Sequence, residues 1–158
     1  MGLDVSAFSK VDWTQKYGEE MDGKPNMVYV YVHPMLPERA SDIPGTGWYR
    51  HNGRETSGRV SSYTGYNIWR SRLAELVGVQ DRDVWRNPDK YSSIPFFELI
   101  HFSDCEGTIG PAVSAKLAKD FADWETSAER LGELWMNTYR KFKQWVELAA
   151  DGGCVCFH

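Results

Sequence analysis

The chain has 158 residues, of which 42% are hydrophobic and 25% are charged, and this balance excludes a fibrous, collagenous or disordered protein. Its 18 Lys and Arg residues against 22 Asp and Glu residues give a net charge of -4, so the basic surface of a duplex-binding protein is missing. No stretch approaches the roughly 20 apolar residues that cross a bilayer. We therefore expect one globular domain over residues 1–158, with no duplex nucleic acid and no membrane among its partners.

The cysteines and the start of the chain predict the compartment. Cys105, Cys154 and Cys156 are an odd number, and the last two are too close in sequence for a comfortable mutual disulfide. Residues 1–10 lack the basic segment and the apolar block of a secretory signal. We therefore expect reduced thiols and a cytosolic protein.

The N-terminal half begins with strands and loops. Residues 1–8 alternate apolar and polar side chains, and residues 27–33 are β-branched and aromatic almost throughout, so both segments are predicted strands. Residues 18–25 and 34–47 are rich in turn-forming residues, which predicts two exposed loops.

A hairpin is predicted next. Residues 47–51 have the composition of a strand and reach Asn52–Gly53, a dipeptide that suits the positive backbone angles of a type I′ turn. Residues 59–62 are the expected partner strand.

Helical spacing follows. Apolar residues three and four apart predict a helix over residues 65–77, with Ser62 or Thr64 as its N-cap and Gly78 as its stop. Its apolar stripe is expected to pack inward.

The rest of the chain is mainly helical. Residues 79–94 are predicted to be a surface excursion, and residues 96–102 are either a buried strand or a helical turn. One helix is expected to begin at Pro111 and another at about Ser127, the second ending at a glycine pair. Residues 154–158 alternate as an edge strand would.

These elements predict an α+β fold. A small antiparallel sheet from the N-terminal half, with the C-terminal edge strand added, packs against about three helices, and the last two helices form a C-terminal helical pair.

The segment of residues 102–111 is the first candidate site, because main-chain amides and a helix dipole are available where an apolar run meets a helix. Asp104 and Glu106 flank Cys105, and their charges disfavour a phosphate but suit a metal, a basic partner or the donor edge of a base. Gly107 follows them. Alternatively, these residues only cap a turn and supply a tight backbone angle.

Residues 61–70 are the second candidate site. Tyr63 and Tyr66 can stack on a ring, Asn67 can form hydrogen bonds, and Arg70 can bind an anion. Alternatively, the hydroxyl residues of this segment cap the helix and its aromatic residues belong to the core.

Two other chemistries are weaker. His101 and Cys105 would form a nucleophilic pair only if they meet in space, and the flanking carboxylates disfavour a thiolate. Cys154, Cys156 and His158 offer soft ligands, but zinc sites normally need a second cysteine pair. The chain has no phosphate loop, zinc-protease helix, serine elbow or dinucleotide fingerprint, so we predict no metal and no cofactor.

Three blocks carry a family resemblance: MGLDVSAFS at residues 1–9, SYTGYNIWR at 62–70 and FSDCEGTIGPAVSAKLAKDF at 102–121. With these blocks the chain resembles a group of uncharacterised proteins of bacteriophages and prophages. The resemblance implies a bacterial host cell as the setting. Small acidic proteins in that setting often antagonise host defence, by covering a host protein or by sequestering a signalling nucleotide.

We therefore expect a non-enzymatic binding protein whose two candidate sites converge on one pocket or partner surface. Its ligand would be a small polar, nucleotide-like molecule or a host protein. The alternative is a small hydrolase or transferase in which Asp104 and Glu106 act with a histidine or a metal. A third interpretation places the functional face in the loops of residues 34–47 and 79–94.

Overall fold

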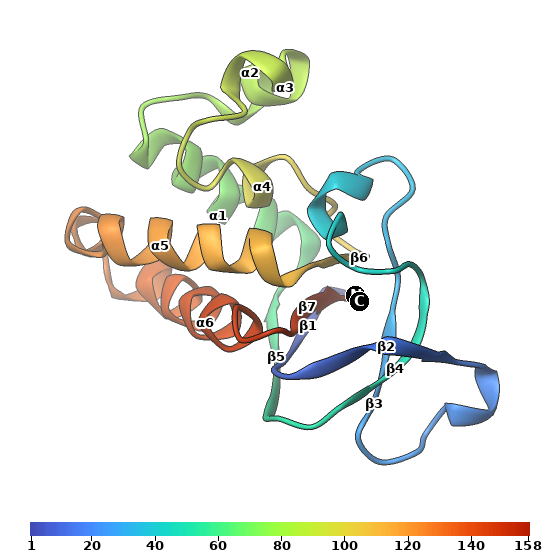
Figure 1. Ribbon diagram of the computed structural model, residues 1–158. Helices are drawn as coiled ribbons and strands as arrows, with labels where there is room; N and C mark the ends of the chain where they lie inside the picture. Colours follow the sequence, from blue (N-terminus) through green and yellow to red (C-terminus); the bar gives the residue numbers. More distant parts are fainter.

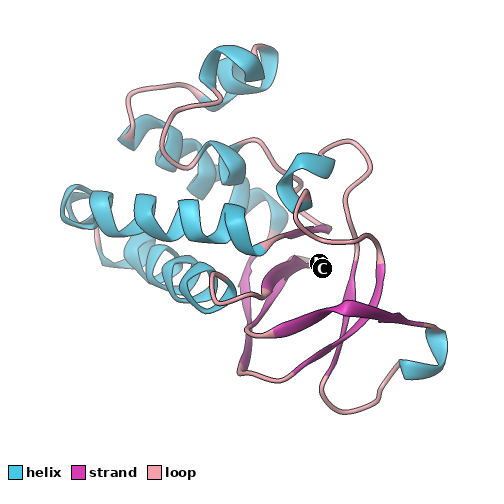
Figure 2. Ribbon diagram, in the orientation of Figure 1, coloured by secondary structure: helices cyan, strands magenta, loops and turns pink.

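The computed structural model describes residues 1–158 and has three layers (Figures 1 and 2). A four-stranded antiparallel sheet lies in the middle, with helices on one face and a three-stranded antiparallel sheet on the other. The α+β class, the antiparallel pairing and the C-terminal helical pair predicted from the sequence are confirmed. No helix combines the length and the apolar character needed to span a bilayer.

The four-stranded sheet has the order β5–β1–β7–β6. Its strands are β1 (Leu3–Phe8), β5 (Glu55–Ser61), β6 (Gly107–Ile109) and β7 (Cys154–Phe157). The alternation in β1 buries its odd-numbered residues against the helices and turns Asp4, Ser6 and Phe8 to the opposite face. The predicted C-terminal strand exists, but it lies between β1 and β6 and is not an edge strand, because β6 adds to its outer side.

The three-stranded sheet has the order β2–β4–β3, formed by β2 (Val11–Tyr17), β3 (Met27–Val30) and β4 (Gly47–His51). The strand predicted over residues 27–33 is shorter in the structure and ends at Val30. A small apolar cluster fills the space between the two sheets, and it consists of Val11, Val28, Val30, Ala40, Ile43, Tyr49, Cys154 and Cys156. Burial of these side chains holds one sheet over the other.

The hairpin predicted at Asn52–Gly53 is wrong. β4 pairs with β2 and β3, whereas β5 pairs with β1, so the chain passes from one sheet to the other at this dipeptide. Gly53 does not have a positive φ, and its special role is close approach, since a Cβ there would collide with the Ser9 hydroxyl. β1 leaves its sheet at the same corner, where the Asn52 amide donates to the Lys10 carbonyl at 2.9 Å.

Three long helices cover the other face of the four-stranded sheet. α1 (Tyr63–Leu76) begins at Ser62, whose hydroxyl accepts a hydrogen bond from the Gly65 amide at 3.0 Å, as predicted. α5 (Pro111–Ala128) begins at its predicted proline and is followed by α6 (Glu133–Ala149). Trp69 of α1 and Trp135 of α6 stack at 5.4 Å, and each indole donates to the other residue's carbonyl.

Short helices occupy several segments that the sequence left irregular. They are η1 (Glu19–Met21), η2 (Pro37–Ala40), α2 (Asp81–Arg86), α3 (Pro88–Tyr91), α4 (Phe97–Ile100) and η3 (Glu129–Leu131). Residues 96–102 thus contain the helical turn and not the strand. The loop of residues 34–47 is only partly exposed, contrary to the prediction, because its residues Leu36, Arg39, Ala40 and Ile43 are buried.

Arg39 is buried, and its guanidinium holds α4. Arg39 donates to the carbonyls of Glu98 at 3.0 Å and His101 at 2.6 Å, and its charge lies 5.0 Å from the centre of the Phe97 ring. Its Nη2 is also 3.2 Å from Nδ1 of His101. Because a guanidinium has only N–H donors, Nδ1 of His101 must accept this hydrogen bond, and the imidazole is therefore neutral.

The neutrality of His101 makes the stability of the fold depend on pH. Burial lowers the pKa of His101 below its ordinary value of 6.5, and the charge of Arg39 lowers it further. Glu38 raises this pKa by less than Arg39 lowers it, and Arg70 adds a smaller lowering effect. Since the folded pKa is depressed, stabilisation by the neutral form is complete above the unfolded pKa. It is lost as the pH falls from about 6.5 towards the folded pKa.

We expect the free energy of unfolding, measured in urea, to decrease between pH 7.5 and pH 5 in the wild type. His101→Asn keeps an acceptor near the position of Nδ1 but cannot be protonated in this range, so its decrease should be smaller. Histidines 33, 51 and 158 remain in both proteins and cancel in the comparison. Equal decreases in the two proteins would contradict this account.

Candidate ligand-binding cleft

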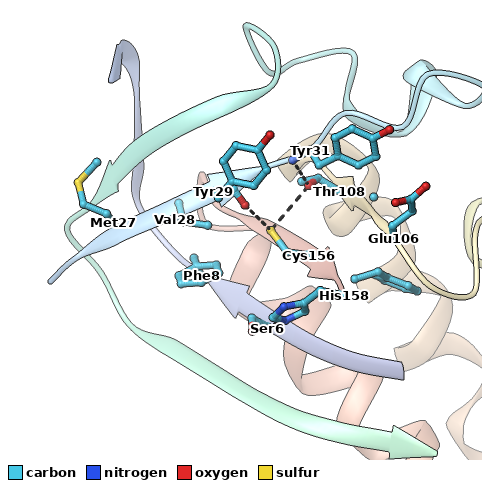
Figure 3. Close-up of a pocket in the computed structure, with 12 residues that line it drawn as sticks. Ser6, Phe8, Met27, Val28, Tyr29, Tyr31, Glu106, Thr108, Cys156 and His158 are labelled. Atoms are coloured by element: carbon cyan, nitrogen blue, oxygen red, sulfur yellow. Dashed lines mark hydrogen bonds between the residues drawn. The ribbon is translucent and has the colours of Figure 1, made fainter. Parts of the chain in front are cut away.

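A cleft of about 440 Å³ opens between the two sheets, where β3 stops covering the four-stranded sheet (Figure 3). Tyr29 and Tyr31 stand on one side, and Ser6 and His158 stand on the opposite side. The complete lining is Ser6, Phe8, Met27, Val28, Tyr29, Tyr31, Glu106, Gly107, Thr108, Cys156, Phe157 and His158. The walls are thus mainly aromatic and apolar, with a few polar groups between them.

Thr108 and Cys156 form the polar contacts across the cleft. The Tyr31 amide donates to the Thr108 hydroxyl at 3.1 Å, and this hydroxyl donates to the Cys156 sulfur at 3.7 Å (Figure 3). The Cys156 thiol lies 3.9 Å from the Tyr29 carbonyl. These weak contacts tie β3 to β6 and β7 and set the width of the cleft.

A second pair lies on the uncovered part of β1. The Ser6 hydroxyl is 2.9 Å from Nε2 of His158, and the His158 backbone exchanges two hydrogen bonds with Asp4. Both side chains are available at the surface of the cleft because the three-stranded sheet does not extend over them.

The cleft contains one carboxylate side chain, that of Glu106, and one histidine, His158, but no lysine or arginine. Glu106 is exposed on the segment that leads into β6, and it forms no ion pair. Hydrogen bonding from Cys154 lowers the pKa of the Cys156 thiol, against the opposite effect of burial, and the Thr108 hydroxyl adds to the lowering. The site therefore offers acceptors and polarisable surface, and it lacks a lysine or arginine for a phosphate.

The two candidate sites predicted from the sequence lie beside each other. Asn67 of α1 donates to the Asp104 carboxylate at 2.7 Å, and Arg70 donates to the Phe102 carbonyl at 2.5 Å. Residues 61–70 and 102–111 are thus joined directly. Glu106 and Gly107, which follow Asp104 by two and three residues, line the cleft.

Tyr66 and Arg70 have a different role from the one predicted. Arg70 is only 7% exposed and donates to the Leu99 and Phe102 carbonyls and to Asn67, so it has no free fork for an anion. Tyr66 is completely buried beside Arg70 and packs on Trp69 and Phe142, so no face is left for stacking on a ligand. Core packing takes the surfaces of both side chains, so the structure favours the alternative interpretation, in which these residues belong to the core.

The other predicted residues lie outside the cleft. Tyr63 is half-buried at the first turn of α1, and Asp104 is held by Asn67. Cys105 is exposed, with its sulfur 3.6 Å from the Ser103 hydroxyl, whereas His101 packs against Arg39, so these two residues do not form a pair.

The cysteines of β7 are free thiols. The sulfurs of Cys154 and Cys156 are 3.8 Å apart and both are buried. No group of three or more His, Cys, Asp or Glu side chains is arranged to hold a metal ion.

Sequence reasoning missed most of the cleft, including Ser6, Tyr29, Thr108 and His158. One signal was present: Cys154, Cys156 and His158 alternate along the final strand and therefore share one face. That face becomes part of a site only because β3 covers half of it, and this long-range packing has no local pattern.

No protein-family model, curated protein or solved structure matches the chain. The resemblance to phage and prophage proteins stays a prediction. The function is therefore inferred from the geometry and charge of the cleft.

Gly107 shapes the inner wall of the cleft. Its φ is +121°, and a Cβ there would lie 2.7 Å from Cζ of Phe102. Gly107→Ala should reduce the free energy of unfolding by more than about 2 kcal/mol, because backbone strain and a clash act together. Gly23→Ala is the matched control, since Gly23 also has a positive φ but has open space around it, and it should cost about 1 kcal/mol. Equal losses in urea unfolding would show that the Phe102 contact is unimportant.

Proposed function

We propose that this protein is a non-enzymatic binding protein that holds a small planar ligand in the cleft between its two sheets. The observation that carries the proposal is the lining: aromatic and apolar walls around a single carboxylate side chain, with no lysine or arginine. The favoured ligand has a flat ring and hydrogen-bond donors, as a nucleobase or a nucleoside has.

The size and walls of the cleft support a small ligand. Pockets of about 300–1,000 Å³ lined by apolar and aromatic groups with a few polar atoms are typical of small-molecule sites. Tyr29 is 48% exposed and packs on Trp48 at 5.2 Å, so its ring is partly ordered before a ligand arrives. Ordering before binding reduces the entropy cost of association.

The charge of the cleft selects the ligand. Glu106 accepts hydrogen bonds, and the Ser6, Thr108 and His158 side chains supply further polar atoms. A phosphate inside the cleft would meet the carboxylate without a lysine or arginine to compensate its charge. A nucleotide-like ligand would therefore place its base in the cleft and leave its phosphates in solvent.

The setting is proposed from the sequence resemblance. In a bacterial host cell carrying a phage or prophage, a protein that sequesters a signalling nucleotide or its base could antagonise host defence. The alternative partner is a host protein. The two possibilities differ in what remains attached to the purified protein: a small molecule in the first case and a host protein in the second.

The alternative function, a small hydrolase or transferase, needs different residues from those predicted. Asp104 is bonded to Asn67, and His101 is bonded to Arg39. The contact between Ser6 and His158 is the arrangement that favours catalysis, because an imidazole within hydrogen-bond reach can take a proton from a hydroxyl. No third side chain forms a hydrogen bond with His158 to orient it.

Glu106→Gln tests the binding proposal. The substitution keeps the size of the side chain and removes its charge, so the affinity for a donor-bearing ring should fall about 10- to 100-fold. Isothermal titration with adenine, guanine, cytosine and their nucleosides and nucleotides measures the affinity.

Glu129→Gln, on η3 and outside the cleft, is the control and should leave every affinity unchanged. Added phosphates should not strengthen binding. Tighter binding of nucleotides than of nucleosides, or equal affinities for wild type and Glu106→Gln, would count against the proposed site.

Ser6→Ala separates binding from catalysis. We expect it to alter ligand affinity only slightly and to leave any background hydrolysis of p-nitrophenyl acetate unchanged, because Ser6 is not a nucleophile in this account. A loss of ester hydrolysis in both Ser6→Ala and His158→Gln, with unchanged thermal stability, would favour the enzyme.

A further inference from the structure

β5 forms an open edge of the four-stranded sheet. Only β1 pairs with it, on one side, and its residues are half-buried or exposed (Figure 1). A groove of about 420 Å³ runs beside this edge, between β5 and the C-terminal half of α6. An unpaired edge of seven residues is a template for another strand.

The hydrogen bonds show which residues offer their backbone at this edge. The Arg54 carbonyl points to β1, since it accepts from the Ser9 amide at 2.9 Å. The Arg59 carbonyl points outward and accepts from the Lys141 side chain at 3.2 Å. Because the direction alternates along an antiparallel strand, Glu55, Ser57 and Arg59 present their N–H and C=O groups outward.

A second β5 strand, antiparallel and centred on Ser57, satisfies these groups. Ser57 then faces its own copy, and Glu55 faces Arg59 of the partner subunit at both ends. Each such pair exchanges two backbone hydrogen bonds. The side chains of Glu55 and Arg59 contact His51 at 3.2 Å and Asp4 at 2.6 Å within the same chain, but they remain 65% and 59% exposed. The same register therefore sets their opposite charges side by side across the interface.

The charged side chains of the two α6 helices are complementary in the same arrangement. Lys141 lies at the level of Arg59, whereas Gln144 and Glu147 border the groove at the level of Glu55. A two-fold axis through Ser57 brings Lys141 of one copy towards Glu147 of the other, whose carboxylate also pairs with Lys143 on its own helix at 2.6 Å. Helix and strand therefore favour the same register.

We propose that two copies of this chain associate through β5 into one continuous antiparallel sheet. The interface is isologous, with the α6 helices of both copies on the same face of the sheet. In the dimer, Lys141 exchanges its contact with the Arg59 carbonyl for the partner carboxylate.

Charge exchange tests the interface directly. Sedimentation of the wild type should show a monomer–dimer equilibrium that depends on concentration. Glu55→Arg places like charges opposite each other in its own dimer, as Arg59→Glu does, so each should weaken dimerisation by more than about tenfold. An equimolar mixture of the two variants restores both pairs and should recover the dimer.

Folding is kept separate from association. Arg59→Glu loses its contact with Asp4, and Glu55→Arg loses its contact with His51. Lys141→Glu mixed with Glu147→Lys therefore provides a second exchange that keeps both of these contacts and loses the pair between Lys143 and Glu147 instead. Arg86→Glu, exposed on α2, should dimerise as the wild type does. A wild type that stays monomeric at every concentration overturns the proposal and leaves the edge for an extended segment of another protein. Unchanged dimerisation in all charge variants overturns it as well.

Discussion

The close approach of three backbone segments at one corner determines the rest of this structure. Gly53 lies against Ser9, and Gly153 lies against the Phe8 carbonyl, at positions where any Cβ would collide. The Lys10 amide also donates to the Asp151 carbonyl at 2.8 Å. Here β1 and β4 both leave one sheet for the other, so the three-stranded sheet folds over half of the four-stranded one. The uncovered half forms the floor of the cleft.

The burial of two arginines explains why the cleft has no guanidinium. Arg39 and Arg70 approach α4 and together bind the carbonyls of residues 98, 99, 101 and 102, which lie in and just after this one-turn helix. A short helix leaves these carbonyls without intrahelical partners, and positive charge is favourable at a helix C-terminus. The guanidinium groups near the candidate site thus stabilise the fold, and Glu106 is left as the charge that a ligand meets.

The features of the fold that the sequence predicts correctly are those set by local residue patterns. Ser62 and Pro111 mark helix starts, and the alternation of β1 marks its buried face, because each signal depends only on neighbouring residues. The hairpin prediction at Gly53 is wrong because Asn-Gly is compatible with that turn, whereas the close contact with Ser9 joins segments 44 residues apart. Residues 61–70 and 102–111 lie beside each other, but only the second segment reaches the cleft. The burial of Tyr66 and Arg70 depends on packing that periodicity does not describe.

The central claim is that the cleft holds a small planar ligand with hydrogen-bond donors. Native mass spectrometry of protein purified gently from bacterial cytosol, before and after mild denaturation, tests this claim directly. The account predicts an added mass in the range of a base, a nucleoside or a nucleotide, which is released on denaturation and is reduced in Glu106→Gln. A retained metal ion, or a small molecule that Glu106→Gln holds as firmly as the wild type does, would contradict it.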